Sequence, residues 1–82
     1  MDASNIVSSA RIQGFRISKY LGVVYAGPFA SYQDLLADVV SQGNSLKADW
    51  IVSFSVQSSM SESRVDRTFS GFGTAVRVKP RS

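Results

Sequence analysis

Positively charged side chains gather in the C-terminal third of this sequence. Five of its nine Lys and Arg residues lie there, at Arg64, Arg67, Arg77, Lys79 and Arg81. The planar guanidinium group of arginine forms paired hydrogen bonds with phosphate and carboxylate groups. If several copies assemble, symmetry multiplies this charge, and an aromatic ring beside it can stack on a base. The residues that we expect to bind a small anionic or nucleotide-like ligand are therefore Arg64, Arg67, Arg77, Lys79 and Tyr20.

Two other interpretations of the same charge remain open. Dispersed Lys and Arg residues also keep a protein soluble without binding anything in particular. Direct binding of nucleic acid through the basic third is the other alternative. The net charge of +3 is small for a dedicated nucleic-acid binder, which usually has a clustered basic surface, so we favour a small ligand.

Residue combinations for catalysis or metal binding are missing from the sequence. It contains no Cys and no His, which excludes disulfides and the usual thiolate and imidazole metal sites. Asp49, Glu62 and Asp66 offer oxygen ligands, but they lack the close spacing of a calcium loop. The serines have no evident base beside them, and Asp34 and Asp38 belong on the exposed face of a predicted helix. We expect no enzyme, no metal and no cofactor.

The size of the chain favours one domain that needs a partner. Eighty-two residues are too few to divide, so we expect a single domain over residues 1–82. A domain of this size buries only about 60% of the surface of its unfolded chain, and oligomerisation is the stabilising device that remains without cysteine. The sequence shows neither a signal peptide nor an apolar run of about 20 residues, so we expect a cytoplasmic protein without membrane contact.

The alternation of apolar and polar residues predicts three strands. They cover residues 15–27, 50–57 and about 65–79, with a serine-rich hairpin loop between the last two. A shorter strand over 6–9 is a further option.

Between the first two strands the apolar period changes to that of a helix. Residues 31–47 predict an amphipathic helix, with Ser31 suited to cap its N-terminus and a break expected near Gly43. The order strand, helix, strand, strand is typical of an α+β fold, a small antiparallel sheet with one helix packed across it.

The segment "SGFGTAVRV" predicts a strand with one nearly bare face. Gly71, Gly73 and Ala75 share that face, and glycine inside a strand often marks the close approach of another body. We expect this stripe to admit either the helix side chains Leu36 and Val40 or a strand of a neighbouring subunit. The candidate interface residues are Gly71, Gly73, Ala75 and Phe69.

Both faces of the predicted sheet carry apolar residues. A single helix covers only one face of a sheet, and an uncovered face tolerates water only where it is polar. The second face is therefore expected to pack against further copies of the chain.

The C-terminal half resembles the YbjQ-like family of small domains. The resemblance rests on "KADWIVSFSV" followed by "GFGTAVRVKP", and on "ISKYLGVVYAG" as the first strand, and it covers residues 15 to 79. It implies a dodecin-like fold and a ring, commonly a pentamer, and it brings a heavy-metal-binding label. Three features depart from the family: Lys47 replaces a glycine, the segment after Val24 is short, and the soft-metal ligands are absent.

These observations together predict a non-enzymatic homo-oligomeric binding protein. Its small ligand would lie at subunit boundaries or in a central opening. The alternatives are a protein-binding scaffold or inhibitor that acts through its exposed surface, and the nucleic-acid binder considered above.

Overall fold

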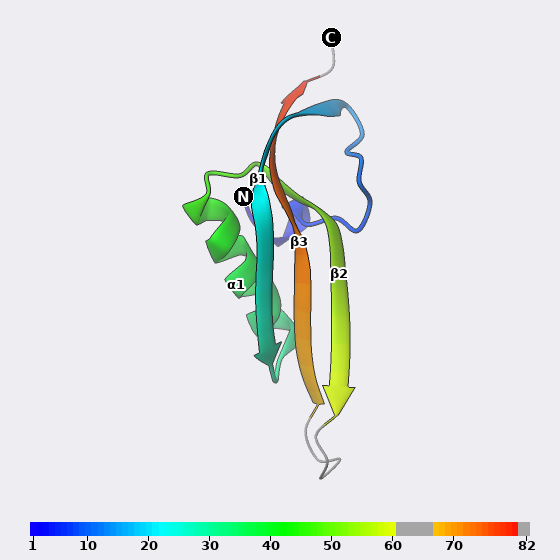
Figure 1. Ribbon diagram of the computed structural model, residues 1–82, viewed down its shortest axis with the longest axis vertical. Coiled ribbons are helices and arrows are strands. Elements are labelled where there is room, and N and C mark those ends of the chain that lie inside the picture. The colour runs from blue at the N-terminus through cyan, green and yellow to red at the C-terminus, as the bar shows by residue number, and fades with distance from the viewer. Residues whose placement is uncertain (61–66, 81–82) are drawn as a thin grey trace.

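Three long antiparallel strands and one helix make up most of the chain (Figure 1). The computed structural model describes residues 1–60 and 67–80. Its elements are a short 3-10 turn η1 (Ala3–Asn5), β1 (Phe15–Phe29), α1 (Tyr32–Ser45), β2 (Trp50–Met60) and β3 (Arg67–Pro80). The strand order is β1-β3-β2, and α1 lies across one face of the sheet. This is the predicted α+β fold; residues 65 and 66 of the predicted last strand lie outside the described residues.

The helix begins where the sequence predicted and continues past the predicted break. The hydroxyl of Ser31 accepts a hydrogen bond from the backbone N–H of Gln33 at 3.2 Å, which confirms the N-cap. The prediction of a break near Gly43 is wrong, because α1 runs to Ser45. A Cβ atom at Gly43 would lie 2.8 Å from the sulfur of Met1. Gly43 therefore admits the N-terminal residue instead of ending the helix.

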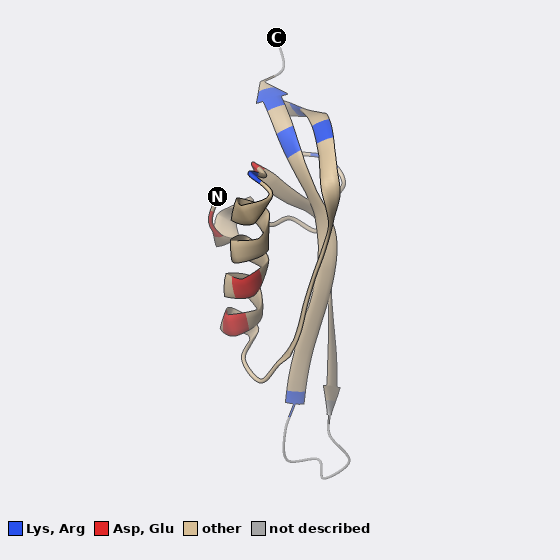
Figure 2. Cartoon of the chain, turned by 60° about the vertical axis from the view of Figure 1, so that its left-hand side comes forward, with Lys and Arg blue, Asp and Glu red and all other residues tan. Residues whose placement is uncertain are grey.

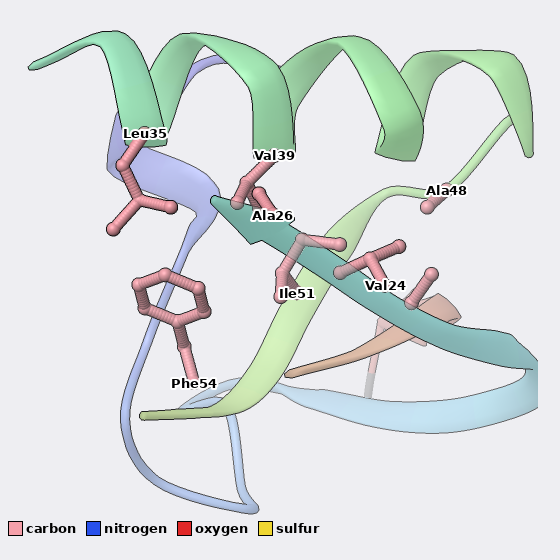
Figure 3. Packing of buried hydrophobic residues seen from close by; sticks show 8 residues of the cluster. Val24, Ala26, Leu35, Val39, Ala48, Ile51 and Phe54 are labelled. Atoms are coloured by element: carbon pink, nitrogen blue, oxygen red, sulfur yellow. The ribbon is translucent and has the colours of Figure 1, made fainter. Parts of the chain in front are cut away.

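The main core lies between α1 and the sheet (Figure 3). Leu35 and Val39 point from the helix toward the strands, and both are fully buried. The strand residues packed around them are Val24, Ala26, Ile51, Phe54 and Ala75. Leu36 is partly buried against this core, and together with Val40 it also lines a groove on the side of α1 next to Asp2 and Ala3.

Side chains of the neighbouring strand β2 fill the bare stripe of β3. A Cβ atom at Gly71 would lie 2.7 Å from the ring tip of Phe54, and one at Gly73 would lie 2.7 Å from Cγ2 of Ile51. Ala75 is fully buried in the same core. Within the chain, the space beside Gly71 and Gly73 is thus occupied by Phe54 and Ile51 rather than by Leu36 and Val40.

The N-terminal segment lies along the outer edge of β2. The N–H of Val7 donates to the carbonyl of Ile51 at 2.9 Å, and the carbonyl of Val7 accepts from the N–H of Phe54 at 3.0 Å. Ile6 forms an isolated parallel bridge with Ile51, so the optional strand near residues 6–9 is present only in this minimal form. On the opposite edge of the sheet, the side-chain amide of Gln42 donates to the carbonyl of Tyr25 at 2.7 Å.

Candidate functional site

The sheet face away from α1 carries several of the large apolar side chains that are exposed to solvent. Val23 and Tyr25 of β1 alternate with the buried Val24 and Ala26, so they point away from the helix. The pairing of β1 with β3 sets Val23 opposite Thr74 and Tyr25 opposite Phe72. The exposed fractions are 73% for Val23, 60% for Tyr25 and 44% for Phe72. We call these three residues the open face.

One end of the same side of the sheet is covered by the chain itself. Ile12, from the segment that precedes β1, packs on Val52 and Val76 in a second small core. Phe15 and Trp50 flank this core, with ring centroids 6.3 Å apart. The open face is thus the part of this side that the N-terminal segment does not reach.

Four cations lie together where β1 begins and β3 ends. The strand register sets Arg16 opposite Lys79 and Lys19 opposite Arg77. Figure 2 shows these positions as blue bands at one end of the sheet, while the acidic residues of α1 lie lower on the helix. Like charges directly opposite each other destabilise a pair of strands. We call Arg16, Lys19, Arg77 and Lys79 the cation ladder.

One backbone carbonyl binds the guanidinium of Arg77. Its Nε donates to the carbonyl oxygen of Lys47 at 3.1 Å. Lys47 has φ 59°, the left-handed conformation that follows the end of α1. The nearby carboxylate of Asp49 accepts a hydrogen bond from the N–H of Val78 at 3.1 Å. Within residues 1–60 and 67–80, no carboxylate forms an ion pair with the cation ladder.

A groove of about 250 Å³ lies at the same end of the sheet, on the side away from α1. Arg11 and Arg16 line it together with the apolar residues Ile12, Phe15 and Ile17 and with Tyr20. Tyr20 is 68% exposed. The groove therefore combines two guanidinium groups with aromatic and aliphatic surface.

The structure divides the predicted ligand-binding residues between two ends of the sheet. Arg77, Lys79 and Tyr20 lie at the end with the ladder and the groove. Arg67 begins β3 and so lies at the opposite end, while Arg64 falls outside the described residues. Three cations that were not predicted as site residues lie at the same end of the sheet: Lys19 opposite Arg77, Arg16 opposite Lys79, and Arg11 in the groove.

The predicted interface residues lie on the helix side of the sheet or beside it. Gly71, Gly73 and Ala75 are buried under the chain's own side chains. Phe69 is half-buried and makes an edge-to-face contact with Tyr32, with ring centroids 6.1 Å apart. The open face lies on the other side of the sheet from these residues.

The described residues contain no other group of chemical note. No cluster of three or more Asp and Glu residues that could hold a metal ion occurs in residues 1–60 and 67–80. Hydrogen bonds from the hydroxyl and N–H of Ser4 lower the pKa of Asp2, which caps η1. No helix in the described part of the chain has the length and apolar character needed to cross a membrane.

Comparison with known proteins supports the fold. No protein-family model and no curated protein matches the chain. Among solved structures, the chain is similar to a DUF74 family protein of unknown function from Pediococcus pentosaceus, with a TM-score of 0.58 and 22% sequence identity. The match covers 90% of this chain and 96% of the other. DUF74 is YbjQ-like, so the architecture agrees with the sequence resemblance.

Proposed function

We propose that this chain is a non-enzymatic YbjQ-like protein that self-associates through its open face and holds a small anionic or nucleotide-like ligand beside it. The observation that carries the proposal is the exposure of Val23, Tyr25 and Phe72 side by side on two paired strands. Contiguous apolar surface of this kind, rimmed by polar residues, is typical of interaction sites. The family resemblance favours a closed ring, commonly a pentamer.

Another copy of the chain is the occupant that fits this surface best. A stable interface buries about 800 Å² on each partner, which is roughly a seventh of the 5476 Å² surface of this chain. Tyr and Phe are enriched at the centre of such interfaces and Lys, Glu and Asp are depleted there, as they are on the open face. The groove of Phe15, Ile17 and Tyr20 lies on the same side of the sheet as the open face, so a second copy would border it.

Light scattering with two matched lysine variants tests the self-association. Val23→Lys introduces a charge in the centre of the open face, where it would be desolvated on assembly. Ser41→Lys adds the same charge at an exposed position on α1. We expect oligomers for the wild type and for Ser41→Lys, and folded single chains for Val23→Lys. A wild type that is folded and monomeric at high micromolar concentration contradicts the proposal, and so does a Val23→Lys variant that assembles normally.

A further inference from the structure

We propose that the cation ladder is a binding site for a small anion with several negative charges, of the oligophosphate class. The site would lie on the side of the sheet that carries α1, separate from the groove on the opposite side. This proposal goes beyond the proposed function. It does not require a second copy, because all four residues of the ladder belong to one chain.

The four side chains of the ladder share one side of the sheet. The Nε of Arg77 reaches the carbonyl of Lys47, which lies in the segment directly after α1. Lys79 is two positions further along β3, and side chains at this spacing point the same way. The other two ladder residues lie directly opposite on β1, so they face the same side. The intervening Val78 packs on the small core of the other side.

A β-bulge brings the two cations of β1 together. In a regular strand, positions 16 and 19 would face opposite sides of the sheet, because side chains alternate. The register shifts between Ile17 and Lys19, where Ser18 is an extra residue on β1. Its hydroxyl donates to the carbonyl of Arg77 at 3.2 Å. The bulge thus sets Lys19 beside Arg16 on the α1 side, and bulges that re-aim a side chain are frequent next to functional sites.

The ladder carries positive charge that the described part of the chain does not neutralise. All four of its residues are exposed, and like charges directly opposite each other on paired strands repel. The carboxylate of Asp49 lies close by, but it accepts the backbone N–H of Val78 and forms no ion pair with the ladder in the described chain. In Figure 2 the acidic residues of α1 lie away from this end of the sheet. A bound anion would remove the repulsion.

The spacing of the ladder suits an anion with more than one charged group. Residues directly opposite each other on antiparallel strands have Cα atoms about 5 Å apart, and residues two positions apart along a strand are about 7 Å apart. Arg77 uses its Nε on the carbonyl of Lys47, and its two Nη groups have no hydrogen-bond partner among the described residues. These Nη groups can form paired hydrogen bonds with phosphate, while the two lysines add compact ammonium charges.

The phosphate groups alone would be recognised at this site. The rings of Phe15 and Tyr20 belong to the groove on the other side of the sheet, so they cannot stack on a base whose phosphates lie against the ladder. Arg67, which could extend a basic track along β3, lies at the opposite end of that strand. A small oligophosphate therefore fits the ladder better than a long nucleic acid does.

Titration calorimetry on the full chain at low salt tests this site. The probes are inorganic tripolyphosphate, orthophosphate, ATP, adenosine and a single-stranded oligonucleotide. We expect tripolyphosphate to bind more tightly than orthophosphate, and adenosine not to bind. ATP should match tripolyphosphate within about threefold, because only its phosphates are held. Tripolyphosphate should also raise the Tm of the chain, because it binds the folded state.

Charge-neutral variants on both sides and at both ends of the sheet provide the matched controls. We expect Lys19→Gln and Arg77→Gln each to weaken tripolyphosphate binding about fivefold or more. Arg11→Gln removes a charge from the groove side, and Arg67→Gln removes one from the far end of β3. Each of these should alter affinity less than about twofold, because distant exposed charges are screened. Without ligand, Lys19→Gln should raise the Tm, because one repulsive pair is lost, whereas a damaged fold would lower it.

Four outcomes overturn the site: no binding of tripolyphosphate, much tighter binding of ATP than of tripolyphosphate, a loss in either control variant equal to that in Lys19→Gln, or binding of the oligonucleotide alone. The second would move recognition to the base. The last would identify a nucleic-acid surface, with affinity that falls steeply as salt rises. Light scattering on the same samples separates these results from the proposed function. An oligomer that binds no anion removes only the site, and a monomer whose tripolyphosphate binding depends on Lys19 removes only the assembly.

Discussion

Tyr25 and Phe72 lie directly opposite each other on β1 and β3, and both rings are largely exposed to solvent. A cross-strand aromatic pair contributes stability even in water, but on a face without a cover it also presents a large apolar surface. If copies assemble through this face, the solvent exposure of these two rings should fall more than that of other residues.

Chemical labelling of tyrosines should detect this loss of solvent exposure. We expect Tyr20 and Tyr25 to become protected as the protein concentration rises and the chain assembles. Tyr32, 45% exposed at the start of α1 on the other side of the sheet, is the internal control and should label equally at all concentrations. Mass spectrometry after brief iodination measures all three. Equal protection of Tyr32 would place the interface elsewhere.

The helix-to-sheet core should be sensitive to the loss of side-chain volume. Val39 is fully buried among Val24, Ala26 and Ile51, so Val39→Ala should lower the free energy of unfolding by about 1–3 kcal/mol. Val23→Ala, at a position 73% exposed, removes the same atoms from the open face. In dilute solution it should change stability by less than about 0.5 kcal/mol. Urea unfolding at one fixed protein concentration measures both, and similar losses would contradict this core.

The close contact of Gly71 with Phe54 should appear as coupling between two substitutions. Gly71→Ala places a methyl group 2.7 Å from the ring tip of Phe54 and should destabilise the chain by about 1–3 kcal/mol. Phe54→Leu shortens the opposing side chain, so the double variant should be more stable than the sum of the single losses predicts. Strict additivity would mean that the ring does not fill the stripe.

The left-handed conformation of Lys47 predicts a stabilising substitution. Lys47 has φ 59°, which glycine adopts without the steric cost that a Cβ atom brings. We expect Lys47→Gly to raise the free energy of unfolding by about 0.5–1 kcal/mol, while Lys47→Ala gives no gain. Thermal unfolding distinguishes them. A loss of stability in Lys47→Gly would show that the lysine side chain outweighs the backbone.

The backbone conformation of Lys47 also gives a physical reason for the glycine that the YbjQ-like family has at this position. The sequence comparison identified Lys47 as a departure from a glycine, and the structure shows why glycine suits that place. The period-two alternation of β1 and β3 and the cap at Ser31 could also be predicted, because each follows from local rules. These elements of the fold can therefore be predicted from short segments of the sequence.

The composition of the candidate site was harder to predict. Arg16 and Lys19 lie opposite Lys79 and Arg77 through the register of strands some sixty residues apart. That register shifts at three places along β1, and the first shift, between Ile17 and Lys19, falls inside the ladder. Bulges of this kind leave little mark in an apolar pattern. The helix stripe was too broad as predicted: Leu35 and Leu36 point about 100° apart around the helix axis, and Leu35 is the one that is fully buried.

The hydrogen bonds at the two borders of the sheet bear on how copies can meet. Residues 7 to 9 occupy backbone groups of β2, and the Gln42 amide occupies a carbonyl of β1. Open strand borders are the usual starting points for uncontrolled fibril growth, and here each is partly obstructed by the chain's own groups. Two copies that met border to border would first have to displace these groups, so contact between flat faces is the less obstructed arrangement.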